Sequence, residues 1–202
     1  MAQVATKGVT VKSPREIIAM RQAGMVVAST LELLKNTIEP GMRTRDLDAL
    51  AAAEIQRLGA KPAFLGYRGF PATICVSLNE EIVHGIPGSR KIVEGDLVKT
   101  DVGAIVDGLY GDAAVTIGVG RITDKAQKLI ETTQKSLFAG IREVGPGVRL
   151  GDIGAAIQRY AEERGYSVVR EYVGHGIGRR LHEDPSVPNY GIPGRGLPLR
   201  PG

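Results

Sequence analysis

Two aspartates near the middle of the chain are spaced so that they could act together. The segments Leu97–Val106 and Leu109–Val119 alternate in character around Asp107-Gly108, which is the signal of a β-hairpin with a two-residue turn. Counting back from that turn places Asp101 and Asp112 on one face as diagonal neighbours, roughly 7 Å apart at their Cα atoms. The sequence therefore predicts two carboxylates that converge.

The surroundings of this pair favour a bound cation. The same face carries Leu97, Gly103 and Ile105, an apolar lining in which unpaired negative charges repel each other and are poorly solvated. A divalent cation would relieve both effects. The alternative is that one aspartate forms a surface salt bridge and the other a turn, and a one-residue shift in register would place the two on opposite faces. From the hairpin alone, both interpretations stay open.

All three histidines of the chain lie in glycine-rich apolar loops rather than on a helix face. His175 lies between two glycines, where the backbone allows close approach and the imidazole can reach into a cleft as a metal ligand. His182 follows seven residues later, but Ser186 stands where the zinc motif H-E-x-x-H requires a second histidine, so that motif is absent. Taken alone, His84 is interpreted as structural or exposed.

The elements that must position these residues alternate between helices and strands. Ser13 and Glu16 form a capping-box pattern with Pro14 at the first helical position, which predicts the start of a long helix. Its inward face is expected to contain the residues that recur at helical spacing, namely Ile17, Met20, Gly24, Val27, Leu31 and Leu34. Helices are expected from Ser13 towards Pro40, from Thr44 to Leu58, from Thr123 towards Gly145 and from Leu150 to Arg164, and strands beyond the hairpin at Thr73–Ser77 and Val168–Val173.

Composition limits the class of protein. The chain has 202 residues, of which 43% are hydrophobic and 24% are charged, which suits one globular domain. The composition indicates no transmembrane span, Met1–Ser13 lacks an apolar core of secretory type, and the lone Cys75 cannot form an internal disulfide. A cytoplasmic protein is expected. The net charge of +4 is interpreted as a solvated surface, with a polyanionic partner left open.

Three motifs in this order carry a resemblance to a known family. Asn79–Gly88 reads N-E-E-I-V-H-G-I-P-G, the hairpin carries the aspartate pair, and Gly174–Pro185 reads G-H-G-I-G-R-R-L-H-E-D-P. Together they resemble the type I methionine aminopeptidases in their bacterial form. The resemblance begins at the Ser13 helix and extends to Gly202.

The resemblance implies a fold that the order of helices and strands does not give by itself. This is the α/β pita-bread fold, in which two pseudo-symmetric halves hold a dinuclear metal site on a central, mostly antiparallel sheet flanked by helices. It implies a single peptidase domain over residues 1–202, with an N-terminal half at 1–120 and an incomplete C-terminal half at 121–202.

The resemblance also implies a role for each polar residue. Asp101, Asp112 and His175 bind two divalent metal ions, which would be Co, Mn, Fe or Zn, and Asp112 bridges them. His182 donates to the peptide carbonyl, and His84 contacts the peptide near the new amine. The implied reaction is the hydrolytic removal of N-terminal methionine from nascent polypeptides whose second residue is small. A monomer is expected, with no membrane partner, and the basic surface predicts proximity to the ribosome.

The methionine side chain is expected in an apolar pocket. By resemblance, this pocket is formed by Tyr67, Phe70, Cys75 and Leu181. A thioether packs well against aromatic and sulfur-containing groups, whereas a charged N-terminal residue would be left unsolvated there. The alternative for these residues is plain core packing, which is the better interpretation of Cys75 taken alone.

The end of the sequence departs from the family pattern. The resemblance implies two further glutamate ligands, one in a motif like F-T-I-E-P, and neither motif is present, so three of five ligands remain. Ile92–Gly95 precedes Asp101, and Leu199–Gly202 looks like the counterpart of Ile92–Gly95. Since Asp101 lies six residues after Gly95, a further ligand would be expected six residues after Gly202. The chain is therefore interpreted as C-terminally truncated.

Two other functions fit the same motifs. One is a noncatalytic pita-bread module that binds protein or nucleic acid. The other is a different metallopeptidase of this fold, such as a prolidase or aminopeptidase P, which would prefer X-Pro peptides to peptides that begin with methionine.

Overall fold

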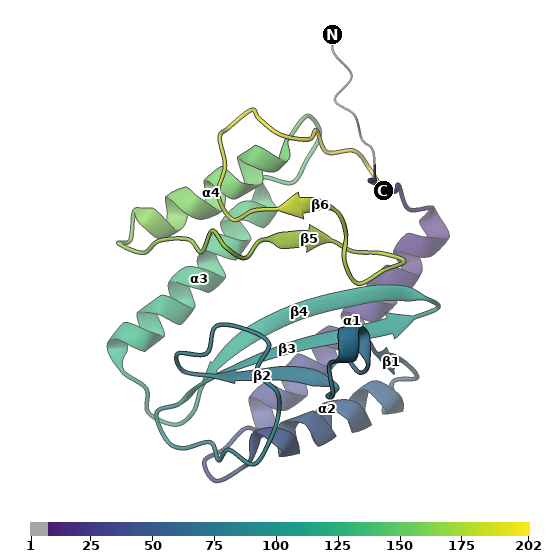
Figure 1. The fold of residues 1–202 in the computed structure, drawn as a ribbon. Helices are drawn as coiled ribbons and strands as arrows, with labels where there is room; N and C mark the ends of the chain where they lie inside the picture. The colour runs from purple at the N-terminus through teal and green to yellow at the C-terminus, as the bar shows by residue number, and fades with distance from the viewer. Residues whose placement is uncertain (1–7) are drawn as a thin grey trace. The chain divides into compact units, whose positions relative to one another are not determined.

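The computed structural model describes residues 8–202, so the first part of the Met1–Ser13 segment lies outside the described residues. Within them the chain forms two compact units. The hairpin unit contains Ser13–Ala126 and Ile177–Leu181, and the α3–α4 unit contains the residues up to Lys12, Gln127–Gly176 and His182–Gly202. Each unit has its own helices and strands (Figure 1).

The hairpin unit is built on an antiparallel sheet of four strands. Its strands are β1 (Lys61–Pro62), β2 (Ile74–Leu78), β3 (Leu97–Val106) and β4 (Leu109–Gly118), and the other three all pair with β3. The register Val106↔Leu109 confirms the predicted two-residue turn. Asp107 and Gly108 both have positive φ, at 49° and 78°, as a type I′ hairpin turn requires.

Two helices cover one face of this sheet, α1 (Pro14–Thr37) and α2 (Thr44–Arg57) (Figure 1). The predicted capping box is confirmed, since Ser13 N donates to Glu16 Oε2 at 2.9 Å and Glu16 N donates to Ser13 Oγ at 3.4 Å. The predicted inward face is wrong at Ile17, which is 40% exposed, and at Gly24, which is exposed as well. The residues of α1 that are buried are Ala19, Ala23, Val26, Val27, Thr30 and Leu34.

Small residues explain this shift of the buried face. A Cβ added to Gly111 of β4 would lie 2.8 Å from the backbone carbon of Ala23, so helix and strand touch through their main chains. By length and composition α1 could also cross a membrane, with a mean hydropathy of 1.4 over its most apolar window, so the sequence-based statement that no stretch could do so is wrong. Its packing against β3 and β4 is that of a core helix.

The α3–α4 unit contains most of α3 (Asp124–Arg142), together with α4 (Leu150–Glu162), β5 (Gly174–Gly176) and β6 (Glu183–Val187). The two helices pack closely at Gly140, where an added Cβ would lie 2.6 Å from Cγ1 of Ile157. The strand expected at Val168–Val173 is wrong: the residues there form an irregular segment. Strand structure begins at Gly174, where β6 provides the antiparallel partner.

Candidate metal centre and substrate pocket

The hairpin brings Asp101 and Asp112 together as its sequence predicted. Asp101 pairs with Ala114 and Gly103 pairs with Asp112, so the two aspartates are diagonal neighbours on one face. The two carboxyl groups are hydrogen bonded to each other. Burial, followed by the charge of Asp112, raises the pKa of Asp101 from 3.8 to about 8. In the absence of a cation, the pair therefore retains a proton near neutral pH.

Strand β2 places a neutral neighbour beside this pair. Cys75 lies directly opposite Asp101 in the β2–β3 register. Burial raises the pKa of the Cys75 thiol to about 12, and the charges of Asp101 and Asp112 add to the effect. The thiol therefore stays protonated and acts as a small apolar group. Two mutually repelling carboxylates in a partly buried place form a donor set that fits a divalent metal ion.

A buried apolar cluster lies against the same strand. A Cβ added to Gly103 would lie 2.5 Å from Cε1 of Phe64, so Phe64 packs on the backbone between Asp101 and Ile105. The four residues expected to line the methionine pocket, Tyr67, Phe70, Cys75 and Leu181, all belong to this cluster, with Ala63, Phe64, Ile105, Tyr110 and Ile177. Residues from four segments of the hairpin unit thus meet here, namely 63–70, β2, the β3–β4 hairpin and 177–181.

The turn that carries Tyr67 is held in an uncommon backbone conformation. It is the 3-10 segment η1 (Tyr67–Gly69), in which Arg68 has φ 50° and ψ 30° between the positive-φ residues Gly66 and Gly69. The Arg68 guanidinium lies 5.4 Å from the centre of the Tyr67 ring, a cation–π distance. A non-glycine residue in this region is strained, and such strain is concentrated at functional sites.

The α3–α4 unit brings His175 and His182 together. Their ring centres are 4.1 Å apart, and the ring planes are tilted by 33°. His175 Nδ1 lies 2.9 Å from the carbonyl oxygen of Gly176. Because a carbonyl can only accept, Nδ1 must carry the proton, and the lone pair of the neutral ring is then on Nε2, the arrangement expected of a metal-binding histidine.

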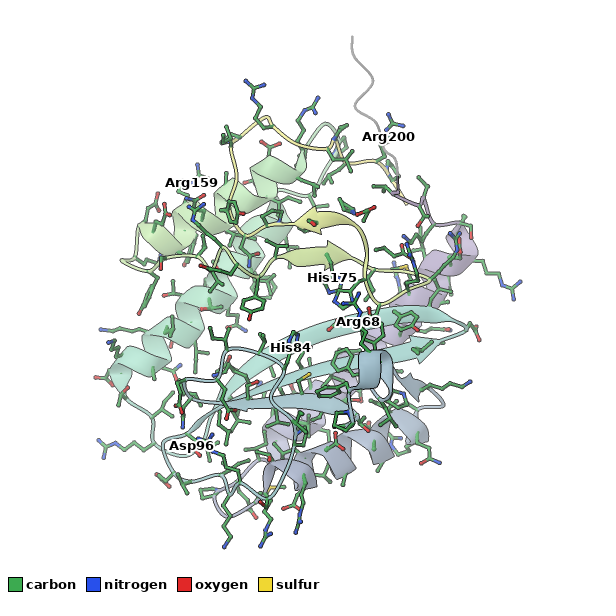
Figure 2. All side chains as sticks on the ribbon, viewed as in Figure 1. Arg68, His84, Asp96, Arg159, His175 and Arg200 are labelled. Carbon is green, nitrogen blue, oxygen red and sulfur yellow. The ribbon has the colours of Figure 1, made fainter. Side chains whose placement is uncertain are left out.

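His84 lies on the segment that follows β2 in the hairpin unit (Figure 2). Its φ is 61°, again strained for a non-glycine residue. The next residue fixes this segment against β2, because Gly85 N donates to Ser77 Oγ at 3.0 Å and Gly85 O accepts from Val76 N at 2.9 Å. An added Cβ at Gly85 would lie 2.2 Å from the Val76 carbonyl oxygen, so glycine is required there.

The predicted site residues are divided between the units. The hairpin unit holds Asp101, Asp112, His84 and the apolar cluster, and the α3–α4 unit holds His175 and His182. Within residues 8–202, neither unit by itself gathers three His, Cys, Asp or Glu side chains into a metal-binding group. The metal roles of Asp101, Asp112 and His175 therefore stay predictions.

Sequence reasoning missed several members of the apolar cluster. Tyr110 could have been found from the hairpin, because it pairs with Ile105, which the sequence placed on the aspartate face. Ile177 carried no such signal, since it joins the cluster through a contact distant in sequence: Tyr110 N donates to Gly178 O at 2.9 Å.

A family model defines the class of protein. The model of metallopeptidase family M24 matches residues 18–202. This match covers both aspartates, all three histidines and the whole apolar cluster, and it assigns the chain to the metallopeptidases.

Individual relatives narrow the class. Methionine aminopeptidase 1 of Bacillus subtilis is 53% identical over 191 residues, which are 95% of this chain and 77% of the relative. The crystal structure of a methionine aminopeptidase from Thermotoga maritima superposes with a TM-score of 0.92 at 47% identity, over 95% of this chain and 78% of that one. The chain belongs to the methionine aminopeptidases of family M24, and the expected α/β pita-bread fold is confirmed.

The prolidase alternative is limited to a likeness of fold. A prolidase from Pyrococcus furiosus superposes with a TM-score of 0.81, but at 23% identity over 94% of this chain and 54% of that one. At that identity the likeness shows a shared architecture and carries no information about substrate.

Proposed function

We propose that this chain contributes the metal and substrate sites for removing N-terminal methionine from nascent polypeptides by metal-assisted hydrolysis. The observation that carries the proposal is the hydrogen-bonded pair Asp101 and Asp112 beside a buried apolar cluster. The proposal treats residues 1–202 as part of one peptidase domain that works in the cytoplasm.

The proposed metal ligands are Asp101, Asp112 and His175, and the ions are two of the class Co, Mn, Fe or Zn. Oxygen-rich ligation with one imidazole suits these metals. The raised pKa of Asp101 supports this assignment, because its burial and its like-charged neighbour both favour a cation over a free anion. When bound, the ions supply Lewis acidity for peptide hydrolysis.

The other residues bind the substrate and manage protons. The cluster with Tyr67, Phe70 and Cys75 accepts the methionine side chain and shields its thioether from water. His182 donates to the developing oxyanion of the peptide carbonyl, and His84 contacts the peptide near the leaving amine. Both histidines are exposed in the described structure, as groups that meet a substrate must be.

Metal titration of chelator-treated protein tests the ligands. Binding of Mn²⁺ is measured by calorimetry for the 202-residue chain, for Asp112→Asn and for Asp107→Asn, which leaves the carboxylate pair intact and preserves the turn as Asn-Gly. We expect Asp112→Asn to weaken binding by more than about 100-fold and Asp107→Asn to bind as wild type. Equal affinities for Asp112→Asn and wild type would contradict the ligand assignment.

Peptide hydrolysis then separates the functions. Methionine release from Met-Ala-Ser, with no cleavage of an X-Pro peptide, supports the proposal. The noncatalytic alternative predicts neither metal binding nor methionine release, so tightly bound metal would count against it. The net charge of +4 supports proximity to the ribosome, which salt-dependent co-sedimentation with ribosomes checks.

A further inference from the structure

A buried ion pair lies next to His182 in the α3–α4 unit. Lys12 Nζ lies 2.6 Å from Glu183 Oε2, and the two side chains are only 9% and 3% exposed. The same carboxylate oxygen accepts from Thr10 Oγ1 at 3.1 Å, and Lys12 Nζ also donates to Thr10 Oγ1 at 2.8 Å. The side chains of Thr10, Lys12 and Glu183 thus bond to one another, and those of Lys12 and Glu183 have little solvent contact.

Burial makes this pair different from the other ion pairs of the unit. Glu131 and Lys135 lie 3.8 Å apart with side chains 48% and 60% exposed, so solvent screens their attraction. Removing one member of a buried pair leaves an uncompensated charge in a poorly solvated place. Loss of Lys12 would therefore weaken the anchoring of Glu183 in this poorly solvated place.

Glu183 lies next to both histidines in the β5–β6 pair. It directly follows His182, and it pairs with Gly176 in the β5–β6 register, one residue after His175. A Cβ added to Gly176 would lie 2.4 Å from the carbonyl oxygen of Asp184, so β5 sits directly on this part of β6. The main chain of Glu183 thus fixes both ends of the loop that brings the two imidazoles to 4.1 Å.

The lysine is itself anchored. Lys12 N donates to the carbonyl oxygen of Gly202 at 2.6 Å, and a Cβ added to Gly202 would lie 2.8 Å from Cγ1 of Val11. Val11 and Lys12 therefore have a fixed position against the rest of the unit, and the Lys12 ammonium group is a fixed point for Glu183.

We propose that Lys12 is a positioning residue for His182 and His175. Through the buried pair with Glu183 it fixes the β5–β6 pairing of Gly176 with Glu183, the residues that directly follow His175 and His182, and so sets the mutual geometry of the two imidazoles. The inference rests on the proposed function only for what His182 and His175 do once they are positioned. Neither Lys12 nor Glu183 touches substrate in this role.

Histidine NMR of the metal-free 202-residue chain tests the geometry without any activity. The chain has three histidines, and His84 lies in the other unit and serves as an internal reference. In Lys12→Met we expect the ring resonances of His182 and His175 to shift while those of His84 stay. Lys12→Arg should restore the wild-type positions in large part, and the control Lys135→Met should leave all three unchanged.

A second variant covers the case in which Lys12→Met does not fold. Lys12→Met/Glu183→Leu removes both charges and replaces them with apolar groups, a change that folded proteins commonly tolerate. Shifted His182 resonances in this folded variant support the proposal. Unshifted His182 resonances in either folded variant, or equal shifts of all three histidines, overturn it.

Kinetics provide a separate check where methionine release is measurable. Lys12→Met should lower kcat by about 10- to 100-fold, as misplacement of catalytic groups does, and change KM by less than about 3-fold. A change confined to KM overturns the positioning role. Because the NMR readout needs neither metal nor turnover, a failure of the proposed function leaves this inference open to its own test.

Discussion

The chain builds the start of a helix in the same way in each of its two units. At α2, Arg43 N donates to Asp46 Oδ2 at 2.7 Å, and at α4, Arg149 N donates to Asp152 Oδ2 at 2.7 Å. Both arginines also form an isolated antiparallel bridge with a later segment, to Lys91 and to Pro198 respectively. The same arginine–aspartate cap thus occurs twice, 106 residues apart, at Arg43 and Arg149.

The strand-like segments that follow repeat as well. Ile92 N donates to Met42 O at 2.8 Å, and Leu199 N donates to Val148 O at 2.8 Å. The structure therefore confirms that Leu199–Gly202 is the counterpart of Ile92–Gly95, which the sequence suggested.

The two repeats differ in what they support. In the hairpin unit, α1 packs on two ten-residue strands, and Leu34 is fully buried. In the α3–α4 unit, the strands have three and five residues, and Leu137 of α3 is 53% exposed. One repeat thus holds its carboxylates on a packed sheet, whereas the other holds His175 on the short strand β5 and His182 directly before β6.

Replacing one leucine by alanine in each long helix tests this difference in packing, and the largest effect is expected here. Leu34→Ala removes a buried side chain and should lower the free energy of unfolding by about 2–5 kcal/mol. Leu137→Ala, at an exposed position, should change it by less than about 0.5 kcal/mol. Urea unfolding followed by circular dichroism measures both. Similar losses in the two variants would show that the α3 face is as well packed as that of α1.

The repeats also differ in the charges they bury, and pH sharpens that difference. The hairpin unit buries two like charges and raises the pKa of Asp101 from 3.8 to about 8. Between those values the folded metal-free chain holds a proton that the unfolded chain has lost, so stability falls as pH rises from about 4 to about 8 and then levels off.

Asp101→Asn should remove this slope. Its Tm, measured in chelator from pH 5 to pH 9, should stay nearly level, while wild type loses several degrees and Asp107→Asn behaves as wild type. Excess divalent cation should restore the wild-type Tm at high pH and have no such effect on Asp101→Asn. An identical pH slope in Asp101→Asn would show that the carboxylate pair is not what titrates.

Sequence patterns predicted the parts of this site that are local. The Asp107-Gly108 turn fixed the register of the hairpin, and that register alone placed Asp101 and Asp112 on one face. The capping box of α1 was equally local, because Ser13 and Glu16 are three residues apart.

The rest depends on contacts between distant segments. No local pattern indicates that Lys12 and Glu183, 171 residues apart, form a buried pair. The strand predicted at Val168–Val173 is wrong for the same reason. A β-rich composition does not show which residues find a partner strand, and here pairing with β6 begins at Gly174.

The smallest effect is expected at the two helix starts, where the repeats are most alike. Asp46→Ala removes the bond from Arg43 N, whereas Asp152→Ala removes the bonds from Arg149 N and from Gly194 N at 2.6 Å. Backbone hydrogen bonds from Gly194 and then Arg149 lower the pKa of Asp152, so its contribution is present at neutral pH and is lost as pH falls through that lowered pKa. Both variants should lower Tm by a few degrees, about 2–4 °C for the loss of one cap, with the larger fall for Asp152→Ala. Differential scanning calorimetry at pH 7 and pH 3 measures them, with Asp124→Ala at the start of α3 as a control. A larger fall for Asp46→Ala would mean that the hairpin unit, not the second bond to Gly194, determines the cost of losing the cap.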